Sequence, residues 1–354
     1  MKSDKKAVFF TKELMVWHIQ ANKRAMPWKG EKDPYIIWLS EIILQQTRVE
    51  QGMEYFNNFV RTYPNIHKLA AAPEKAVFKL WEGLGYYSRC RNLLATAKYI
   101  SKELKGKFPD KYADILALKG VGPYTAAAIA SFAYDLPYAV VDGNVNRVLA
   151  RFFGISKAID NIEGKRTFTD LANTLLDKKR PGLYNQAIMD LGAVVCKPKQ
   201  PLCTTCVLNK HCTAFTRNTV NDYPVKEKKL LKKTRWFYYI VMEYKSRFFI
   251  QKRVGKDIWQ SLHEFYLIEE MQETDVAAIL KRPALKNMAG KNFQLAWASE
   301  IYRQQLTHQT INGCFIHIQI KQPIQLPGYK WVDKGGLKKL AFPVLIKRYI
   351  DSVI

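Results

Sequence analysis

Four of the six cysteines lie in one short segment, and their spacing restricts the local fold more than any other feature of the sequence. They follow the pattern Cys196-x6-Cys203-x2-Cys206-x5-Cys212. Loops of these lengths allow four sulfurs to converge on one centre, which is typical of a tetrathiolate metal site. Zinc and iron–sulfur clusters both accept four thiolates, so the ligand count alone leaves both open.

The charge of the chain indicates a polyanionic partner. Lys and Arg number 56 against 31 Asp and Glu, a formal net charge of +25 over 354 residues. Such an excess attracts nucleic acid over several ångströms. The alternative is a basic enzyme whose charge serves only solubility. A chain of this length also favours two hydrophobic cores over one.

The sequence predicts a cytoplasmic protein. The apolar run at residues 7–10 is too short for a secretory signal, and no segment approaches the length of a membrane span. Thiols stay reduced in the cytosol, which favours metal over disulfides for the cysteine cluster. We expect Cys90 and Cys314, outside the cluster, to be ordinary buried thiols.

The pattern along the chain predicts an all-α domain followed by a smaller α+β domain. Apolar residues recur at helical spacing from Phe10 to Ala214, with Pro or Gly turns between segments. Asp33-Pro34 is typical of the start of a helix. β-branched and aromatic runs at 236–242, 247–251 and 314–320 predict strands. We therefore predict a helical domain at 1–217, a lysine-rich linker at 218–234 and an α+β domain at 235–354.

Two glycines, Gly120 and Gly122, stand one residue apart between helical segments. Glycines there permit a tight turn that brings backbone amides against a phosphate, although a plain helix–helix connection has the same pattern. About twenty residues later the chain reads Val140-Val141-Asp142-Gly143-Asn144. Asp142 is a plausible helix N-cap, and capping does not exclude catalysis.

A second carboxylate, Glu41, lies in the string Trp38-Leu-Ser-Glu-Ile-Ile-Leu-Gln-Gln-Thr47. Its apolar neighbours should disfavour the charged form, so that it can act as an acid near neutral pH. The plainer interpretation is a surface glutamate paired with Arg48. An acid and an anion together suit the loss of a base from a sugar, because the sugar becomes an oxocarbenium-like cation.

These motifs resemble the MutY family of the helix-hairpin-helix, endonuclease III superfamily. The string around Glu41 nearly repeats that family's W-x-S-E-x-x-L-Q-Q-T, and residues 83–92 match its G-L-G-Y-Y-x-R-x-R-N. The cysteine spacing resembles its 4Fe-4S loop, at 196–212. Residues 251–265 are similar to its Nudix-like domain, without the glutamate helix of working Nudix hydrolases. The resemblance implies a monomeric glycosylase that flips adenine, paired with 8-oxoguanine or guanine, out of double-stranded DNA and hydrolyses its glycosidic bond.

The resemblance also assigns roles to residues. Glu41 would protonate adenine and Asp142 would stabilise the sugar cation, with Tyr124 and Asn144 beside them. Tyr124 stands where lyase relatives carry a nucleophilic lysine, which implies a monofunctional enzyme. The cluster ligands would be Cys196, Cys203, Cys206 and Cys212. Contacts to adenine would come from Trp28, Gln186 and Arg24, and contacts to DNA from Gln46, Thr47, Leu84, Tyr86, Gly120, Gly122, Thr307 and His308.

The sequence departs from the family pattern at three places. Lys119 replaces the usual proline of the hairpin, Asn146 replaces a lysine, and Leu306 replaces an aromatic residue before Thr307-His308. Three other functions are consistent with parts of the sequence: an endonuclease III-like lyase for oxidised pyrimidines, a non-catalytic iron–sulfur DNA-binding protein and a nucleotide pyrophosphatase. Tyr124 argues against the lyase, because it replaces the nucleophilic lysine. The two carboxylates argue against a non-catalytic protein, and the missing glutamate helix argues against the pyrophosphatase.

Overall fold

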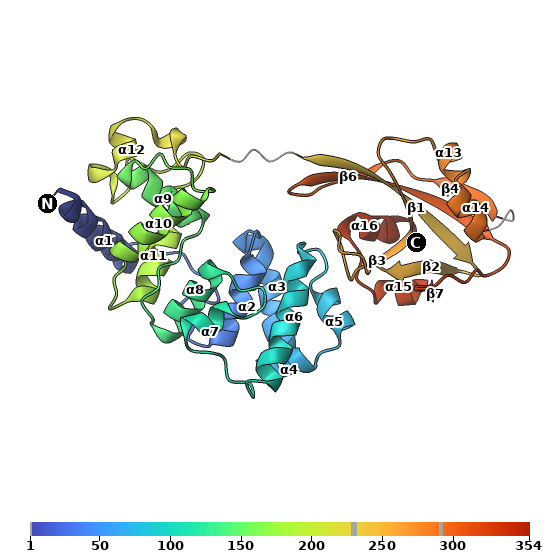
Figure 1. Cartoon of the computed structure of the whole chain (residues 1–354), viewed down its shortest axis with the longest axis horizontal. Coiled ribbons are helices and arrows are strands. Elements are labelled where there is room, and N and C mark those ends of the chain that lie inside the picture. The colour runs from blue at the N-terminus through green and yellow to red at the C-terminus, as the bar shows by residue number, and fades with distance from the viewer. Residues whose placement is uncertain (1, 228–231, 290–292) are drawn as a thin grey trace. The chain divides into compact units, whose positions relative to one another are not determined.

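The computed structural model describes residues 2–227, 232–289 and 293–354 and divides into two compact units (Figure 1). Unit 1 comprises Met1–Ala71 and Asn92–Lys229, and unit 2 comprises Ala72–Arg91 and Leu230–Ile354. By its contacts, the segment 72–91 is therefore part of unit 2, together with the C-terminal residues. The predicted linker lysines at 228 and 229 lie outside the described residues, and the domain boundaries at 217 and 235 stay predictions.

The all-α prediction is confirmed for unit 1. Its longer helices are α1 (Lys2–Gln20), α2 (Pro34–Leu44), α3 (Val49–Thr62), α6 (Tyr87–Lys102, which begins in unit 2), α8 (Pro123–Tyr134), α9 (Gly143–Phe153), α10 (Ile162–Leu175) and α11 (Pro181–Val194). Short ones are α4 (Ile66–Ala71), α7 (Tyr112–Leu116), η1 (Asn209–His211), α12 (Thr213–Thr216) and η2 (Val220–Asp222). As predicted, Asp33 caps α2, its carboxylate accepting from the Tyr35 amide with Pro34 in the first turn.

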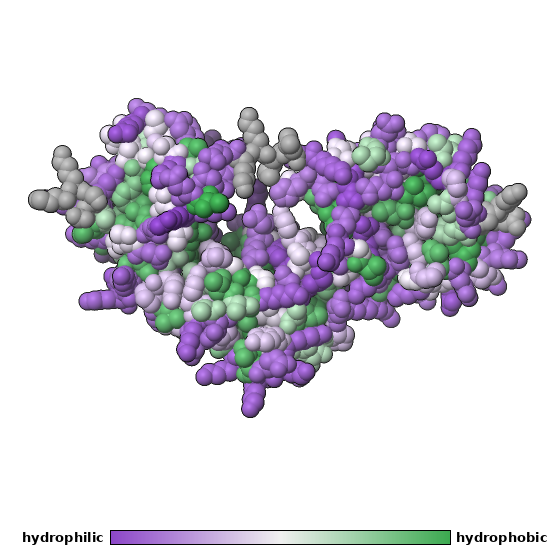
Figure 2. Space-filling model, viewed as in Figure 1, coloured by the Kyte–Doolittle hydropathy of each residue, from purple (hydrophilic) through white to green (hydrophobic). Residues whose placement is uncertain are grey.

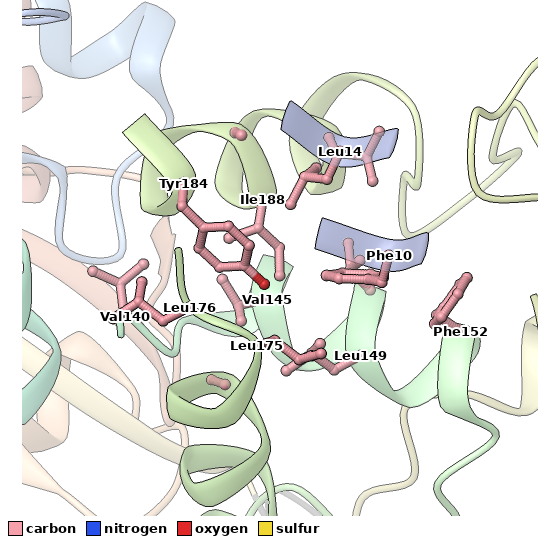
Figure 3. Packing of buried hydrophobic residues seen from close by; sticks show 14 of the residues in the cluster. Phe10, Leu14, Val140, Val145, Leu149, Phe152, Leu175, Leu176, Tyr184 and Ile188 are labelled. Atoms are coloured by element: carbon pink, nitrogen blue, oxygen red, sulfur yellow. The ribbon is translucent and has the colours of Figure 1, made fainter. Parts of the chain in front are cut away.

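The N-terminal helix completes the core of unit 1. Phe10 and Leu14 of α1 are fully buried against residues of α9 and α11, among them Phe152, Tyr184 and Ile188 (Figure 3). The rings of Phe10 and Phe152 lie 4.9 Å apart, at a distance typical of favourable aromatic pairs. This packing holds α9 and α11 in place against α1.

Unit 2 is built on a mixed sheet. In the described residues its strands are β1 (Lys233–Tyr244), β2 (Arg247–Lys252), β3 (His263–Glu270), β4 (Phe293–Ala298), β5 (Tyr302–Gln305), β6 (Gln309–Ile320) and β7 (Tyr329–Asp333). The order is β4-β6-β1-β3-β2-β7, with β5 on β6, and the β1–β6 pair is parallel. The three predicted strands are β1, β2 and β6. Helices are α5 (Glu74–Leu80), α13 (Val276–Leu280), α14 (Pro283–Ala289), α15 (Lys334–Lys338) and α16 (Val344–Val353).

Helices cover both faces of this sheet. Alternate residues of β1 point to opposite faces. Tyr238 and Ile240 pack in one core with Ile279 of α13 and Leu285 of α14. On the β6 strand Phe315 stacks on Tyr349 of α16, with centroids 4.0 Å apart. The view in Figure 2 shows a largely hydrophilic surface with scattered hydrophobic patches. No helix in the described ranges is long and apolar enough to cross a membrane.

Candidate active site

A cavity of about 880 Å³ in unit 1 gathers most of the predicted site residues. Helices α2, α8, α9 and α11 contribute to its wall, together with the loop before α2. The predicted residues that line it are Arg24, Trp28, Glu41, Gln46, Thr47, Tyr124, Asp142, Asn144 and Gln186. Predicted catalytic and adenine-contacting groups, which are far apart in the sequence, thus share one cavity.

Glu41 is a buried carboxyl with a strongly raised pKa. It lies in the middle of α2, among neighbours that are themselves buried, and its side chain accepts a hydrogen bond from the Tyr124 hydroxyl. Burial, reinforced by the charge of Asp142, raises its pKa to about 7, against the opposing effect of the Tyr124 hydrogen bond. Glu41 therefore carries its proton in a large fraction of molecules near neutral pH. Its burial excludes the alternative of a surface ion pair with Arg48.

Asp142 has a more polar environment than Glu41. As predicted, it is the N-cap of α9: one carboxylate oxygen accepts from the Val145 amide at 2.7 Å, and the other accepts from Asn144 Nδ2 at 2.9 Å. Burial raises the pKa of Asp142, while these hydrogen bonds and the Arg147 guanidinium oppose that rise. The two carboxyls face one cavity with different support for the negative form.

Tyr124 stands at the start of α8 and remains a neutral donor. Burial and the adjacent carboxyls Glu41 and Asp142 raise its pKa well above the usual 10. Its hydroxyl therefore keeps its proton and donates to Glu41. This position in the cavity wall carries no amine.

The sequence analysis missed Arg147, which holds Asn144 in place. Its Nη2 donates to Asn144 Oδ1 and to the Gly192 carbonyl, each at 2.7 Å, and its Nε donates to the Cys196 carbonyl at 2.8 Å. One buried guanidinium therefore joins the start of α9, helix α11 and the cysteine loop. The available signal was the spacing Asn144-x2-Arg147, which puts both side chains on one face of a helix.

The sequence analysis also missed Asp190, a fully buried carboxylate behind the cavity wall. Its Oδ1 accepts from Arg24 Nη1 at 2.8 Å and from Gln186 Nε2 at 3.0 Å. Its Oδ2 accepts from Asn22 Nδ2 at 2.7 Å and from Lys29 Nζ at 3.2 Å. Two of the predicted adenine contacts are thus oriented by one residue, whose only sequence signal is its position four residues after Gln186 on α11.

The four clustered cysteines line one small cavity beside Arg151. Within the described part of the chain no three His, Cys, Asp or Glu side chains lie close enough to hold a single metal ion. Burial, together with neighbouring sulfurs, raises the pKa of Cys206 to about 12, so four thiolates there require a bound cationic centre. Cys90 and Cys314 are buried and free, as predicted.

The glycine hairpin has the geometry that its sequence indicates. Gly120 has φ +83°, and a Cβ there would lie 2.7 Å from Asn92 Cβ. Gly122 is the N-cap residue of α8, with Pro123 next. The backbone therefore turns in a conformation that favours glycine and leads into the N-terminus of α8.

The remaining predicted DNA contacts lie in unit 2. Leu84 is buried, whereas Tyr86 is 42% exposed on a turn with positive φ. The Tyr86 hydroxyl and Thr307 Oγ1 form a hydrogen bond. His308 adjoins it, and its carbonyl accepts from the Lys233 amide at 3.0 Å. The structure thus brings Tyr86 and Thr307 together within unit 2.

Family models match two regions of the chain. Residues 39–173 match the HhH-GPD superfamily of base excision DNA repair proteins. Residues 237–352 match the NUDIX domain. The first region contains Glu41, Tyr124 and Asp142, and the second contains Thr307.

Curated relatives are similar over most of the chain. The adenine DNA glycosylase of Buchnera aphidicola subsp. Schizaphis graminum is 37% identical over 258 residues, which cover 72% of this chain and 74% of that protein. That of Arabidopsis thaliana is 35% identical and matches 75% of this chain and 48% of its own length. The Homo sapiens adenine DNA glycosylase is 40% identical over 59% of this chain and 40% of its own length.

Solved structures share the fold of the helical part. A thermostable thymine-DNA glycosylase is 28% identical with a TM-score of 0.57, and the match covers 61% of this chain and all of that one. An endonuclease III in a non-covalent DNA complex has a TM-score of 0.53 at 18% identity, covering 60% of this chain and 97% of that one. The latter likeness concerns the fold alone.

Proposed function

The chain belongs to the adenine DNA glycosylase family, MutY, and from that premise we propose that it removes adenine paired with 8-oxoguanine or guanine in double-stranded DNA. The observation that carries the proposal is the pair of buried carboxyls on one cavity, Glu41 and Asp142, with unequal support for their negative forms. Two carboxyls whose negative forms are supported to different degrees suit one acid and one anion.

The proposed reaction divides the work between these two groups. Glu41 gives its proton to N7 of adenine while the bond between the base and C1′ breaks, and the electron pair of that bond leaves with the base. Asp142, ionised and supported by Asn144, stabilises the positive charge left on the sugar. Water then adds to C1′, and the Glu41 carboxylate takes its proton. The products are free adenine and an abasic site.

The wall of the cavity supports hydrolysis rather than backbone cleavage. Tyr124 occupies the position where lyase relatives carry an amine nucleophile, and its hydroxyl is engaged with Glu41. Two of the lysines that line the cavity are paired: Lys29 Nζ lies 3.2 Å from Asp190, and Lys32 Nζ lies 2.8 Å from Asp135. A Schiff base with the sugar is therefore not part of the proposed mechanism.

Unit 2 supplies the proposed recognition of oxidised guanine. Tyr86 is exposed on a tight turn, in the manner of a side chain inserted into a base stack, and Thr307 lies beside it with a hydroxyl. Flipping a base costs a few kcal/mol, which inserted side chains help to offset. We assign Gln46, Thr47, Leu84 and His308 supporting contacts.

The four cysteines are the proposed ligands of a 4Fe-4S cluster, as the family generally carries. The cluster would supply structural ordering of the loop 196–212. Arg151 lies against this loop: its Nη1 donates to Cys196 Sγ at 3.5 Å and to the Lys197 carbonyl at 2.8 Å. The loop would then present Lys197, Lys199 and Lys210 to phosphates.

An excision assay tests the proposal. The protein is incubated with a duplex carrying adenine opposite 8-oxoguanine, and free adenine and alkali-labile sites are measured. We expect both products, no strand cleavage before alkali, and retained binding but lost excision for Glu41→Gln. Glu54→Gln, an exposed glutamate on α3, is the matched control and should excise like the parent. Strand cleavage without alkali, or undiminished excision by Glu41→Gln, would contradict the mechanism.

A further inference from the structure

The segment Ala72–Arg91 is bound to the C-terminal residues of unit 2 by a small set of polar contacts. It comprises α5, the turn 81–86 and the first residues of α6. The central contact is made by Glu82, whose side chain is only 5% exposed. A charged group is buried to this degree in proteins when several donors compensate the loss of water.

The donors to Glu82 come from three different elements. The backbone amide of Phe342 donates to Oε1 at 2.9 Å. Lys347 Nζ on α16 donates to Oε2 at 2.9 Å, and Lys79 Nζ on α5 donates to the same oxygen at 2.6 Å. Lys79 also donates to the Leu340 carbonyl at 3.1 Å. Glu82 thus joins the segment to α16 and to the loop that precedes it.

A second contact lies on the far side of the turn. Arg91 Nη1 donates to the Gln260 carbonyl at 2.7 Å. The residues on either side of Gln260, Trp259 and Ser261, have φ of +62° and +75°. Backbone strain of this kind persists where surrounding structure holds it.

The turn between these two contacts is held in one conformation. Trp81 Nε1 donates to the Gly85 carbonyl at 3.0 Å, and the Arg89 guanidinium lies over the Trp81 and Tyr86 rings, at 5.2 and 5.6 Å from their centroids. Tyr86 has φ +47° and reaches Thr307 in the turn between β5 and β6. A shift of the segment relative to the sheet would therefore separate Tyr86 from Thr307.

We propose that Glu82 is a positioning residue for the recognition of oxidised guanine. It fixes the segment 72–91 on unit 2, so that the ring of Tyr86 and the hydroxyl of Thr307 form one surface for the lesion. Glu82 touches neither the base nor the sugar, and it acts through the placement of Tyr86. The inference rests on the proposed function, because it concerns which adenine-containing pair is chosen and not how adenine is released.

The test compares two duplexes, with adenine opposite 8-oxoguanine and adenine opposite guanine. Affinity is measured with a non-hydrolysable adenosine analogue, and excision is measured under single turnover at saturating protein. For Glu82→Ala we expect the preference for 8-oxoguanine to fall about tenfold, the factor for one well-placed hydrogen bond. Excision from the guanine duplex should change less than about twofold, since that chemistry lies in the cavity of unit 1.

Glu74→Gln is the matched control. Glu74 lies in the same segment and pairs with Lys252 at 2.8 Å, but its side chain is 47% exposed and its contribution should be small. If Glu82→Ala does not fold, Glu82→Gln keeps an oxygen acceptor and the volume and gives the same readout. An unchanged preference, or an equal loss of affinity for both duplexes, would overturn the inference.

The variant Thr307→Val, alone and combined with Glu82→Ala, provides a second measurement of the preference for 8-oxoguanine. A purely structural role of Glu82 would not make the effects of the two substitutions depend on each other. If Glu82 acts through the Tyr86–Thr307 pair, Thr307→Val lowers the preference by itself, and adding Glu82→Ala to it lowers the preference little further. Fully additive losses would overturn the inference. Failure of the proposed function gives a different result, because the parent protein would then release adenine from neither duplex.

Discussion

Replacing Glu41 by glutamine should stabilise the fold at pH 8 much more than at pH 5. Burial raises the pKa of Glu41 from 4.5 to about 7, so the folded state binds this proton more tightly than the unfolded chain does. The contribution of Glu41 to stability is therefore present in full below pH 4.5 and is lost as the pH rises through 7. At pH 8 the buried carboxylate costs about 3 kcal/mol, against about 1 kcal/mol at pH 5. The neutral amide of glutamine removes that cost.

Urea unfolding of the cluster-bearing protein measures this difference. The midpoints for the parent, Glu41→Gln and the exposed control Glu54→Gln are compared at pH 5 and pH 8. The gain of Glu41→Gln over the parent should grow by about 2 kcal/mol between the two pH values. The control should show no such growth, because Glu54 lies on the exposed face of α3.

The same substitution should abolish most of the excision activity. A general acid contributes about 100- to 10,000-fold to a rate, and we expect a single-turnover loss in that range. In the parent, the rate should fall as the pH rises through about 7, because Glu41 loses the proton that it gives to the base. A stability gain equal at both pH values, or a parent rate that does not fall above pH 7, would refute the assignment of Glu41 as a buried acid.

Three further substitutions test the surroundings of the two carboxyls. Tyr124→Phe removes a hydrogen bond that lowers the pKa of Glu41, so the alkaline limb of the pH–rate profile should move to higher pH. Asp190→Asn leaves two cations without their buried carboxylate and should lower the free energy of unfolding by about 3 kcal/mol, measured with urea, and weaken substrate binding. Gly192→Ala would place a Cβ 2.7 Å from Asn144 Cβ, and should lower the single-turnover rate at least about tenfold while the protein stays folded.

Local sequence patterns predicted most of the fold. Asp33-Pro34 begins α2, and the strand patterns at 236–242, 247–251 and 314–320 lie within β1, β2 and β6. These features depend on caps, periodicity and β-branched residues, which act between near neighbours. The membership of residues 72–91 in unit 2 was not predictable in this way. It depends on contacts such as Glu82 to Phe342 and Lys347, which join residues far apart in the sequence.

In the candidate site too, residues within local motifs were predicted, whereas residues whose roles depend on contacts between distant segments were not. Glu41, Asp142 and Tyr124 were predicted because motifs surround them, and the cap formed by Asp142 follows from its own neighbours. The residues that orient Asn144, Arg24 and Gln186 were missed. Asp190 and Arg147 look like ordinary charged residues within helices, and the contacts of Asp190 with Arg24 and of Arg147 with the Gly192 carbonyl form only on folding. Several of their partners, namely Gly192 and Cys196 for Arg147 and Arg24 for Asp190, lie on other elements, which no local pattern specifies.

The positions of the two carboxyls on their helices agree with the different tasks proposed for them. Asp142 caps the N-terminus of α9, where free backbone amides and the positive end of the helix dipole favour a negative charge. Glu41 lies in the interior of α2, where the backbone amides are engaged within the helix, and the effect of burial on its pKa is opposed by the hydrogen bond from Tyr124. An exchange of the two residues should therefore lower excision: the cap hydrogen bonds would favour the ionised form of a glutamate at position 142, and burial would favour the protonated form of an aspartate at position 41. We infer that the helix position, as much as the residue type, determines which group donates the proton and which one stabilises the cation.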